Sequence, residues 1–267
     1  MDTELKDLIE ETWAEYRTFE SLDVVKKIPP ILFVGDLDGY KQSKIKVITV
    51  ALNPSKKGAE PDVHAREFHE RVGIDNATLS KKPEKYIKGL LEYFEKRPNM
   101  TYFNSFEPIL NELETSYGSV KLSHKSYQNR ALHTDLCSQL TTDPNWGGLI
   151  DPTVQNDLAQ ASSSLWNKLV AQLKPNLILA SFGESHLKWI KLPPYDLNRR
   201  VVDINTWDTT FKIGEKQYPV NCLWLNVGLQ QPQKVFFALG QGSRRPFMIN
   251  NEYKKEIGRQ LFNLYEE

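Results

Sequence analysis

The sequence predicts an α/β fold: a three-layer sandwich in which helices cover both faces of a central, mostly parallel β-sheet. Near-continuous runs of β-branched and apolar residues, typical of strands buried on both faces, occur at 45–52, 130–137, 176–182 and 234–239. Helical patterns separate these runs, and strands that alternate with helices pair in parallel. The chain contains no Gly/Ser/Pro-rich linker and no repeat, so we expect a single domain over residues 1–267.

Apolar spacing and turn chemistry predict the other elements. The first helix is expected to begin at Asp2. Others are expected at 84–96, 105–115, 153–173 and 250–265, with a short helix near Ser185. Residues 30–34 are expected to be extended and are followed by the turn-rich sequence GDLDGYKQ. A hairpin is expected over 200–228, turning at IGEKQ.

Composition excludes several classes of protein. With 25% charged residues and 11% aromatic residues the chain is neither disordered nor fibrous. Two cysteines cannot form a disulfide framework, an all-cysteine zinc site or a four-cysteine iron–sulfur cluster. No apolar run approaches the roughly 18 residues of a membrane span, and the start MDTELKDLIEE lacks a signal-peptide pattern. We expect a soluble, cytoplasmic protein with no membrane partner.

The zero net charge conceals an asymmetry along the chain. Residues 1–20 carry a net charge of −5 and residues 251–267 a net charge of −1, so residues 21–250 carry +6. A basic face of this kind permits binding to nucleic acid, although solvated helix faces and loops account for it equally well.

Unusual polar residues follow three of the expected strands. They are found in Ala51–Ser55 (ALNPS), His133–Ser138 (HTDLCS) and Gly240–Phe247 (GQGSRRPF). Each has an ordinary structural reading as a turn, a helix cap or a basic loop. Ligands of open parallel sheets bind outside the carboxyl ends of the strands, so the three segments together predict a site at that edge.

These segments resemble the uracil-DNA glycosylase superfamily, from about residue 45 to residue 261. VALNPS matches the Asn-Pro form of the first family motif, seen in the mismatch-specific and single-strand-selective enzymes. HTDLCSQL matches the segment that reads the base, with Asp135 at the position of the family's Asn, and ILASFG is similar to the third strand. Of the second motif, His-Pro-Ser or Asn-Pro-Ser, Gln241-Gly242-Ser243 keeps only the serine. Two cysteines exclude the iron–sulfur branches, so no cofactor is expected.

The resemblance implies a monofunctional DNA glycosylase, which flips a nucleotide out of the stack and hydrolyses its N-glycosidic bond to leave an abasic site. Asn53 would position the attacking water through its amide oxygen. Gln241 would replace the family's His as a donor to the departing base, a role worth on the order of 10²–10³ in rate. Asp135 would read the base and assist catalysis.

Further residues are assigned to binding by the same resemblance. Phe68 is the candidate for stacking on the flipped base, although it fits equally well in the core of a helix through AREFHERV. The candidates for gripping DNA are Ser55, Lys56, Lys57, Ser243, Arg244, Arg245 and Phe247. Among these, Phe247 is expected to fill the vacated stack and the two arginines to contact phosphates. His64 and His69 do not have the spacing of a helical metal pair, and no metal is expected.

Two departures from the family bear on which base is read. An ionised Asp135 only accepts hydrogen bonds and would repel O4 of uracil, whereas a protonated Asp135 would accept from N4 and donate to N3 of cytosine. Ser55 stands where the strict uracil enzymes have a tyrosine that blocks C5 substituents. Together they predict release of C5-modified cytosine, hydroxymethylated or glucosylated, as found in phage DNA, in antiviral defence.

Other functions fit the same residues. The protein could be a repair glycosylase for uracil or damaged bases, or a DNA-binding module without catalysis whose binding depends on Lys, Arg and salt. A metal-dependent nuclease using Asp36, Asp38 and Asp135 is a third alternative, although no spacing supports a metal site. No obligate protein partner is expected.

Overall fold

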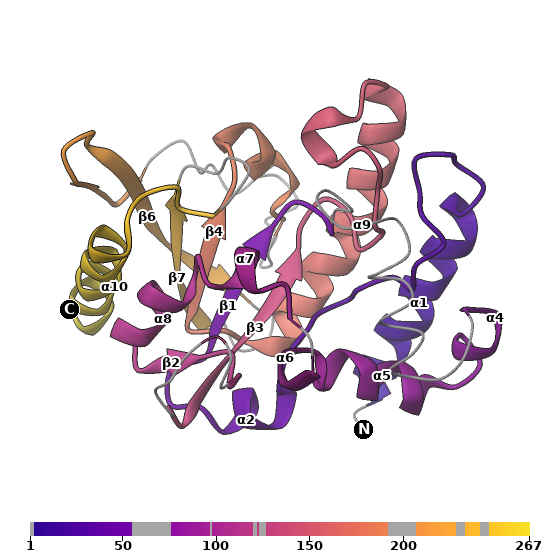
Figure 1. The fold of residues 1–267 in the computed structure, drawn as a ribbon, viewed down its shortest axis with the longest axis horizontal. Coiled ribbons are helices and arrows are strands. Elements are labelled where there is room, and N and C mark those ends of the chain that lie inside the picture. The colour runs from indigo at the N-terminus through magenta and orange to yellow at the C-terminus, as the bar shows by residue number, and fades with distance from the viewer. Residues whose placement is uncertain are drawn as a thin grey trace.

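The computed structural model describes residues 3–54, 76–96, 98–119, 122, 127–191, 207–227, 233–240 and 246–267. Within these residues the chain is an α/β protein whose sheet has seven strands in the order β2-β3-β1-β4-β7-β6-β5 (Figure 1). The strands are β1 (Val47–Ala51), β2 (Thr115–Ser116), β3 (Asn129–Asp135), β4 (Leu177–Ser181), β5 (Thr209–Ile213), β6 (Tyr218–Val227) and β7 (Gln233–Gly240).

The sheet is mostly parallel, as predicted. β1 pairs in parallel with both β3 and β4, β4 pairs in parallel with β7, and β2 continues the parallel part beyond β3. The expected hairpin is confirmed by antiparallel β5 and β6, and β6 also pairs antiparallel with β7. The central strands β1 and β4 are almost entirely buried, which explains why their sequences are continuous apolar runs.

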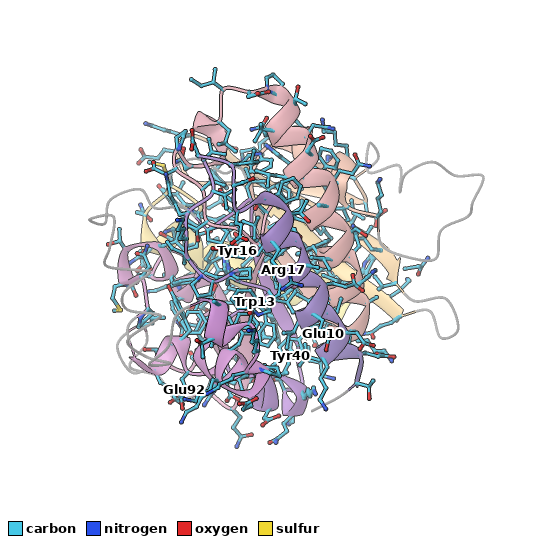
Figure 2. The ribbon with its side chains drawn as sticks, turned by 90° about the vertical axis from the view of Figure 1, so that its right-hand side faces the viewer. Glu10, Trp13, Tyr16, Arg17, Tyr40 and Glu92 are labelled. Carbon is cyan, nitrogen blue, oxygen red and sulfur yellow. The ribbon has the colours of Figure 1, made fainter. Side chains whose placement is uncertain are left out.

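Helices flank this sheet. They are α1 (Thr3–Phe19), α2 (Leu37–Gln42), α4 (Asn76–Leu79), α5 (Pro83–Leu91), α6 (Tyr93–Lys96), α7 (Met100–Phe103), α8 (Glu107–Glu112), α9 (Pro152–Leu173) and α10 (Asn251–Glu266), with 3₁₀ turns η1 (Trp146–Gly148) and η2 (Glu184–Trp189). α1 packs against α9, and α8 packs against α10. Figure 2 shows α1 and α9 side by side, with Trp13 and Tyr16 on α1. Both side chains are buried in the core.

Three sequence expectations were wrong in detail. Residues 30–34 do not form a strand of the sheet; only Val34 makes an isolated antiparallel bridge, to His133. The turn-rich GDLDGYKQ contains a short helix, α2, because Asp36 caps it by accepting a hydrogen bond from the Gly39 N–H at 2.8 Å. The helix expected over 84–96 is divided into α5 and α6 at Glu92.

Candidate functional site

The carboxyl ends of the parallel strands share one edge of the sheet. Ala51 at the end of β1 is the partner of Asp135 at the end of β3, and Ser181 at the end of β4 is the partner of Gly240 at the end of β7. Ala180 pairs with Val50, so Ser181 follows in the row of Ala51. Residues paired across a sheet share a face, and Asp135, Ala51, Ser181 and Gly240 therefore form a row along this edge. We call it the edge row.

Asp135 is the titratable member of the edge row. The residue is 4% exposed, and burial raises the pKa of its carboxyl from 3.8 to about 8. Among the described residues, the basic group within 4 Å of the carboxyl is Nε2 of His133, at 3.8 Å from Oδ1. A buried carboxyl in this setting is protonated at neutral pH, so it donates a hydrogen bond through one oxygen and accepts through the other.

His133 lies behind Asp135, two residues earlier on β3 and on the same face of the sheet. Its Nδ1 is 2.8 Å from Oγ1 of Thr49, which in turn lies 2.6 Å from the hydroxyl of Tyr117. Burial lowers the pKa of His133 to about 3, so its imidazole is neutral. The contact between His133 and Asp135 is therefore one between two neutral groups.

Aromatic rings enclose this pair. The rings of Tyr102, Phe103 and Phe106 lie 5.6, 5.0 and 6.0 Å from the imidazole of His133. Burial, and secondly the charge of Asp135, raise the pKa of Tyr102 well above its usual value, so its phenol remains protonated. The wall comes from α7 and the residues directly before α8, and it excludes water from the side of Asp135 that faces the core.

Asn53, the predicted water-positioning residue, is held by the loop after β3. Its Nδ2 donates to Oγ1 of Thr142 at 2.7 Å and to the carbonyl of Pro54 at 3.0 Å, and its Oδ1 accepts from the Trp146 N–H at 3.2 Å. The amide is thus fixed in orientation. Its oxygen has two lone pairs, so one remains for a further donor.

Two buried polar atoms near this edge lack a hydrogen-bond partner among the described residues. They are Oγ of Ser181 and Oε1 of Gln139, whose Nε2 donates to the backbone carbonyl of Asp135 at 2.9 Å. Buried polar atoms are nearly always paired, so these two oxygens are candidates to bind a ligand or water. Neither residue was assigned from the sequence, because one serine ending an apolar strand has no pattern of its own.

The prediction that Phe247 inserts into DNA was wrong. Its ring is fully buried and lies 6.0 Å from the rings of both Phe106 and Tyr218. The ring occupies the space beside Gly240, where any Cβ would overlap it. Phe247 is therefore a core residue that fills the end of the edge row. The other predicted site residues, Ser55, Lys56, Lys57, Phe68, Gln241, Ser243, Arg244 and Arg245, lie outside the described residues.

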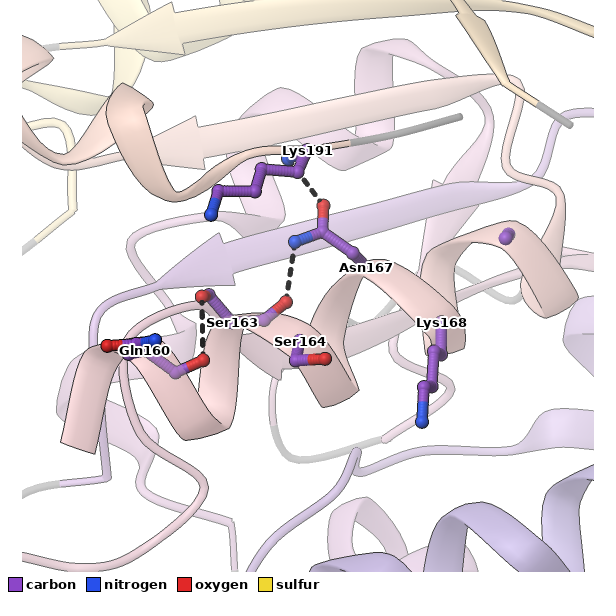
Figure 3. Close-up of a pocket in the computed structure, with 7 residues that line it drawn as sticks. Gln160, Ser163, Ser164, Asn167, Lys168 and Lys191 are labelled. Carbon is purple, nitrogen blue, oxygen red and sulfur yellow. Dashed lines mark hydrogen bonds between the residues drawn. The ribbon is translucent and has the colours of Figure 1, made fainter. Parts of the chain in front are cut away.

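Two hollows occur elsewhere on the described surface. One, of about 440 Å³, lies along α9 and includes Asn167 and Lys191 (Figure 3). In it, Asn167 accepts from the Lys191 backbone N–H at 2.7 Å. The other, of about 400 Å³, lies between α1 and the start of α5. Neither includes Asn53 or Asp135. In the first, Gln160, Ser163, Asn167 and Lys191 are joined to one another by hydrogen bonds.

Among the described residues, no group of three or more His, Cys, Asp or Glu side chains is close enough to hold a metal ion. No helix of that part of the chain is long and apolar enough to cross a membrane. Comparison of the chain with protein-family models, with curated proteins and with solved structures found no match. The interpretation of the edge row therefore depends on its own chemistry.

Proposed function

We propose that the protein is a monofunctional DNA glycosylase that flips a C5-modified cytosine, hydroxymethylated or glucosylated, out of phage DNA and hydrolyses its N-glycosidic bond, in antiviral defence. The observation that carries this proposal is the buried, protonated carboxyl of Asp135 at the carboxyl edge of a parallel sheet. Such edges are where ligands of open α/β sheets bind.

The protonated carboxyl matches the Watson–Crick edge of cytosine. One oxygen accepts from the N4 amino group, while the O–H donates to N3. Transfer of that proton to N3 lets the base leave as a neutral molecule when the electron pair of the broken bond moves onto it. The ionised carboxylate offers only acceptors, which is why the raised pKa of Asp135 supports this assignment.

The chemistry of the edge row suits a flat ring held between an acid and a hydroxyl. Asp135 and Ser181 are two strands apart, about 10 Å between backbones at the usual strand spacing, with only the methyl group of Ala51 between them. The hydroxyl of Ser181, which has no partner among the described residues, is available to a polar atom on the far side of such a ring.

Asn53 is suited to orient the water. Its amide is already fixed by Thr142 and Trp146, so ordering the side chain costs no further entropy when substrate binds. The free lone pair of its oxygen accepts one hydrogen of the water, whose oxygen attacks C1′ as oxocarbenium character develops. Being neutral, the amide takes no proton, which passes to solvent. The roles of Gln241, Phe68, Ser55 and the basic residues remain predictions.

A base-release assay tests the proposal. Duplexes carrying uracil, cytosine, hydroxymethylcytosine or glucosylated hydroxymethylcytosine are incubated with protein and treated with alkali to cut abasic sites. We expect cleavage confined to modified cytosine, reduced by about 10²–10³ in Asp135→Asn and unchanged in Asp157→Asn, an exposed acid of α9. Release of uracil alone would instead assign a repair glycosylase. No release from any duplex, with salt-dependent binding retained, would refute a catalytic role.

A further inference from the structure

A buried chain of polar groups ends on the imidazole behind Asp135. It runs from the hydroxyl of Tyr117 to Oγ1 of Thr49 over 2.6 Å, and from there to Nδ1 of His133 over 2.8 Å. All three residues are at most 4% exposed. Because these groups are buried from water, the direction of each hydrogen bond is set by the three side chains themselves.

The Tyr117 hydroxyl is the donor at the start of the chain. Burial raises the pKa of this phenol well above its usual value, so it keeps its proton. Within the described part of the chain, Thr49 Oγ1 is the acceptor that this proton can reach. The reverse direction would leave a buried O–H unpaired, at a cost of about 1–3 kcal/mol. Tyr117 therefore donates to Thr49.

Thr49 then has one proton and two acceptors within reach. Nδ1 of His133 lies at 2.8 Å and the backbone carbonyl of Leu132 at 3.3 Å. The parallel register of β1 and β3 makes the Leu132 carbonyl an acceptor for the strand ladder as well. We infer that the proton lies in the shorter contact, to Nδ1. Nδ1 is thus an acceptor, and the proton of the neutral imidazole lies on Nε2.

We propose that this chain fixes His133 as the Nε2–H tautomer and makes it the positioning residue of Asp135. Nε2 lies 3.8 Å from Oδ1 of Asp135, beyond hydrogen-bond distance, so the N–H acts on that oxygen through its dipole and favours the acid proton on the other oxygen. The Asp135 carboxyl then has its O–H donor on one fixed oxygen and its acceptor on the other. The part that this arrangement plays in reading a base rests on the proposed function; the tautomer and its effect on Asp135 do not.

Few other titratable groups among the described residues act on the pair. Tyr102, on α7, is linked electrostatically to Asp135 and stays protonated, and Tyr93, on α6, acts on Tyr102. Cys137, two residues after Asp135, keeps its thiol proton because burial raises its pKa. Lys188 of η2 contributes a positive charge, which acts on Cys137. The charge of Glu107, on α8, raises the pKa of Tyr117, which lies at the other end of the three hydrogen-bonded side chains. Among the described residues, His133 therefore carries the basic side chain that lies within 4 Å of the Asp135 carboxyl.

Nitrogen-15 NMR of the histidine-labelled full chain tests the tautomer. The chain has five histidines, and His133→Gln assigns the signal of His133. We expect a protonated Nε2 and an unprotonated Nδ1 at neutral pH. In Thr49→Val the single tautomer is lost, whereas Thr12→Val, a buried threonine bonded to the Leu8 carbonyl, leaves it unchanged. A proton on Nδ1, or on both nitrogens, in the wild type overturns the proposal, as does a Thr49→Val spectrum identical to wild type.

Carbon-13 titration of the Asp135 carboxyl tests the positioning role. His133→Phe removes the N–H, and we expect the midpoint of Asp135 to rise by about one pH unit, because a nearby N–H dipole stabilises the charged carboxylate. His133→Gln keeps an N–H at the same reach and is expected to restore the midpoint to within about half a unit. An unchanged midpoint in His133→Phe refutes the role. If the spectra behave as expected but no duplex releases a base, only the proposed function fails.

Discussion

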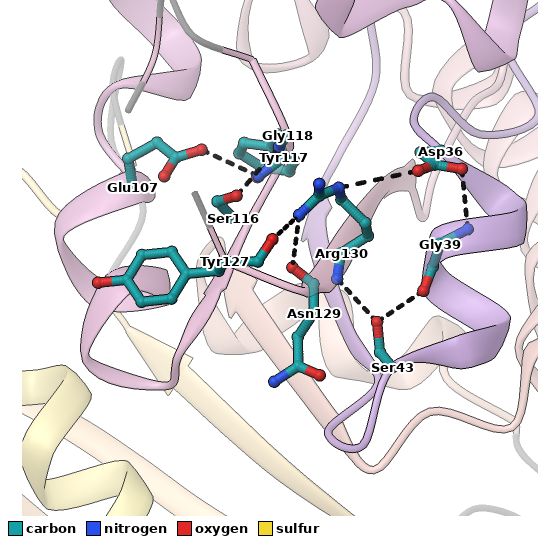
Figure 4. A network of polar contacts seen from close by, with 10 residues as sticks. All are labelled: Asp36, Gly39, Ser43, Glu107, Ser116, Tyr117, Gly118, Tyr127, Asn129 and Arg130. Atoms are coloured by element: carbon teal, nitrogen blue, oxygen red, sulfur yellow. Dashed lines mark hydrogen bonds and ion pairs between the residues drawn. The ribbon is translucent and has the colours of Figure 1, made fainter. Parts of the chain in front are cut away.

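The two ends of β3 contrast in how their polar groups are bonded. At the amino end, Arg130 is fully engaged: its guanidinium donates to the carbonyls of Tyr127 and Asn129 and pairs with Asp36, and its backbone N–H donates to Ser43. Figure 4 shows this network. At the carboxyl end, neither Asp135 nor the hydroxyl of Ser181 is fully bonded within the described part of the chain. Asp135 has no charged partner there within hydrogen-bond distance, and Ser181 has no hydrogen-bond partner there.

The difference separates a structural polar cluster from a site. Saturated hydrogen bonding, as around Arg130, stabilises one arrangement of α2 against the sheet and leaves nothing for a ligand. Buried groups left neutral or unpaired, as at the edge row, reduce stability and persist where a ligand uses them. Both ends of the strand are polar in the sequence, and only the bonding distinguishes them.

The largest expected effect is the pH dependence of Asp135→Asn. Burial raises the folded-state pKa of Asp135 from 3.8 to about 8, so the folded protein binds this proton more tightly than the unfolded chain does. The resulting stability is complete below about pH 3.8 and is lost as the pH rises to 8. We expect Asp135→Asn to match wild type at pH 4 and to exceed it by on the order of 3–5 kcal/mol at pH 8.

Urea unfolding at pH 4, 6 and 8 measures this difference. Glu15 and Glu107, whose pKa values burial raises to about 7, contribute a slope of the same sign in both proteins and cancel in the comparison. Parallel stability curves for the variant and wild type would show that Asp135 ionises normally and would remove the contrast between the ends of β3.

Arg130→Met is expected to have the next largest effect, at the opposite end of the strand. It leaves the carbonyls of Tyr127 and Asn129 without their donor, and we expect a loss of about 2–3 kcal/mol in the free energy of unfolding. Lys168→Met removes an exposed ion pair with Glu11 and is the control, at about 0–1 kcal/mol. Equal losses in the two variants, measured by chemical denaturation, would mean that the amino-end network contributes no special stability.

Ser181→Ala is the smallest and most discriminating change. Because its hydroxyl has no partner in the described structure, we expect stability to change by less than about 0.5 kcal/mol or to rise slightly. Base release is expected to fall about tenfold, the worth of one neutral hydrogen bond to the substrate. Ser164→Ala, on the exposed face of α9, is the control. A marked loss of stability with unchanged release would place Ser181 among the structural residues.

The sequence by itself determined the architecture. The spacing of apolar residues shows which faces of a strand or helix are buried, as in the β-branched run of β1 and the apolar pattern of α9. The parallel sheet, the hairpin and most helices were therefore predicted. It also indicated which strand ends carry Asn53 and Asp135, because parallel strands bring their carboxyl ends to one edge.

Tertiary structure decided what local patterns cannot record. The sequence predicted Phe247 to be an exposed side chain beside two arginines. Its ring instead packs against Gly240 and Phe106, which the fold brings next to it. The charge state of Asp135 depends on burial by α7 and β1, and the tautomer of His133 depends on Thr49 and Tyr117. Desolvation and hydrogen-bond direction arise from neighbours brought together by folding, so they become visible only in the assembled molecule.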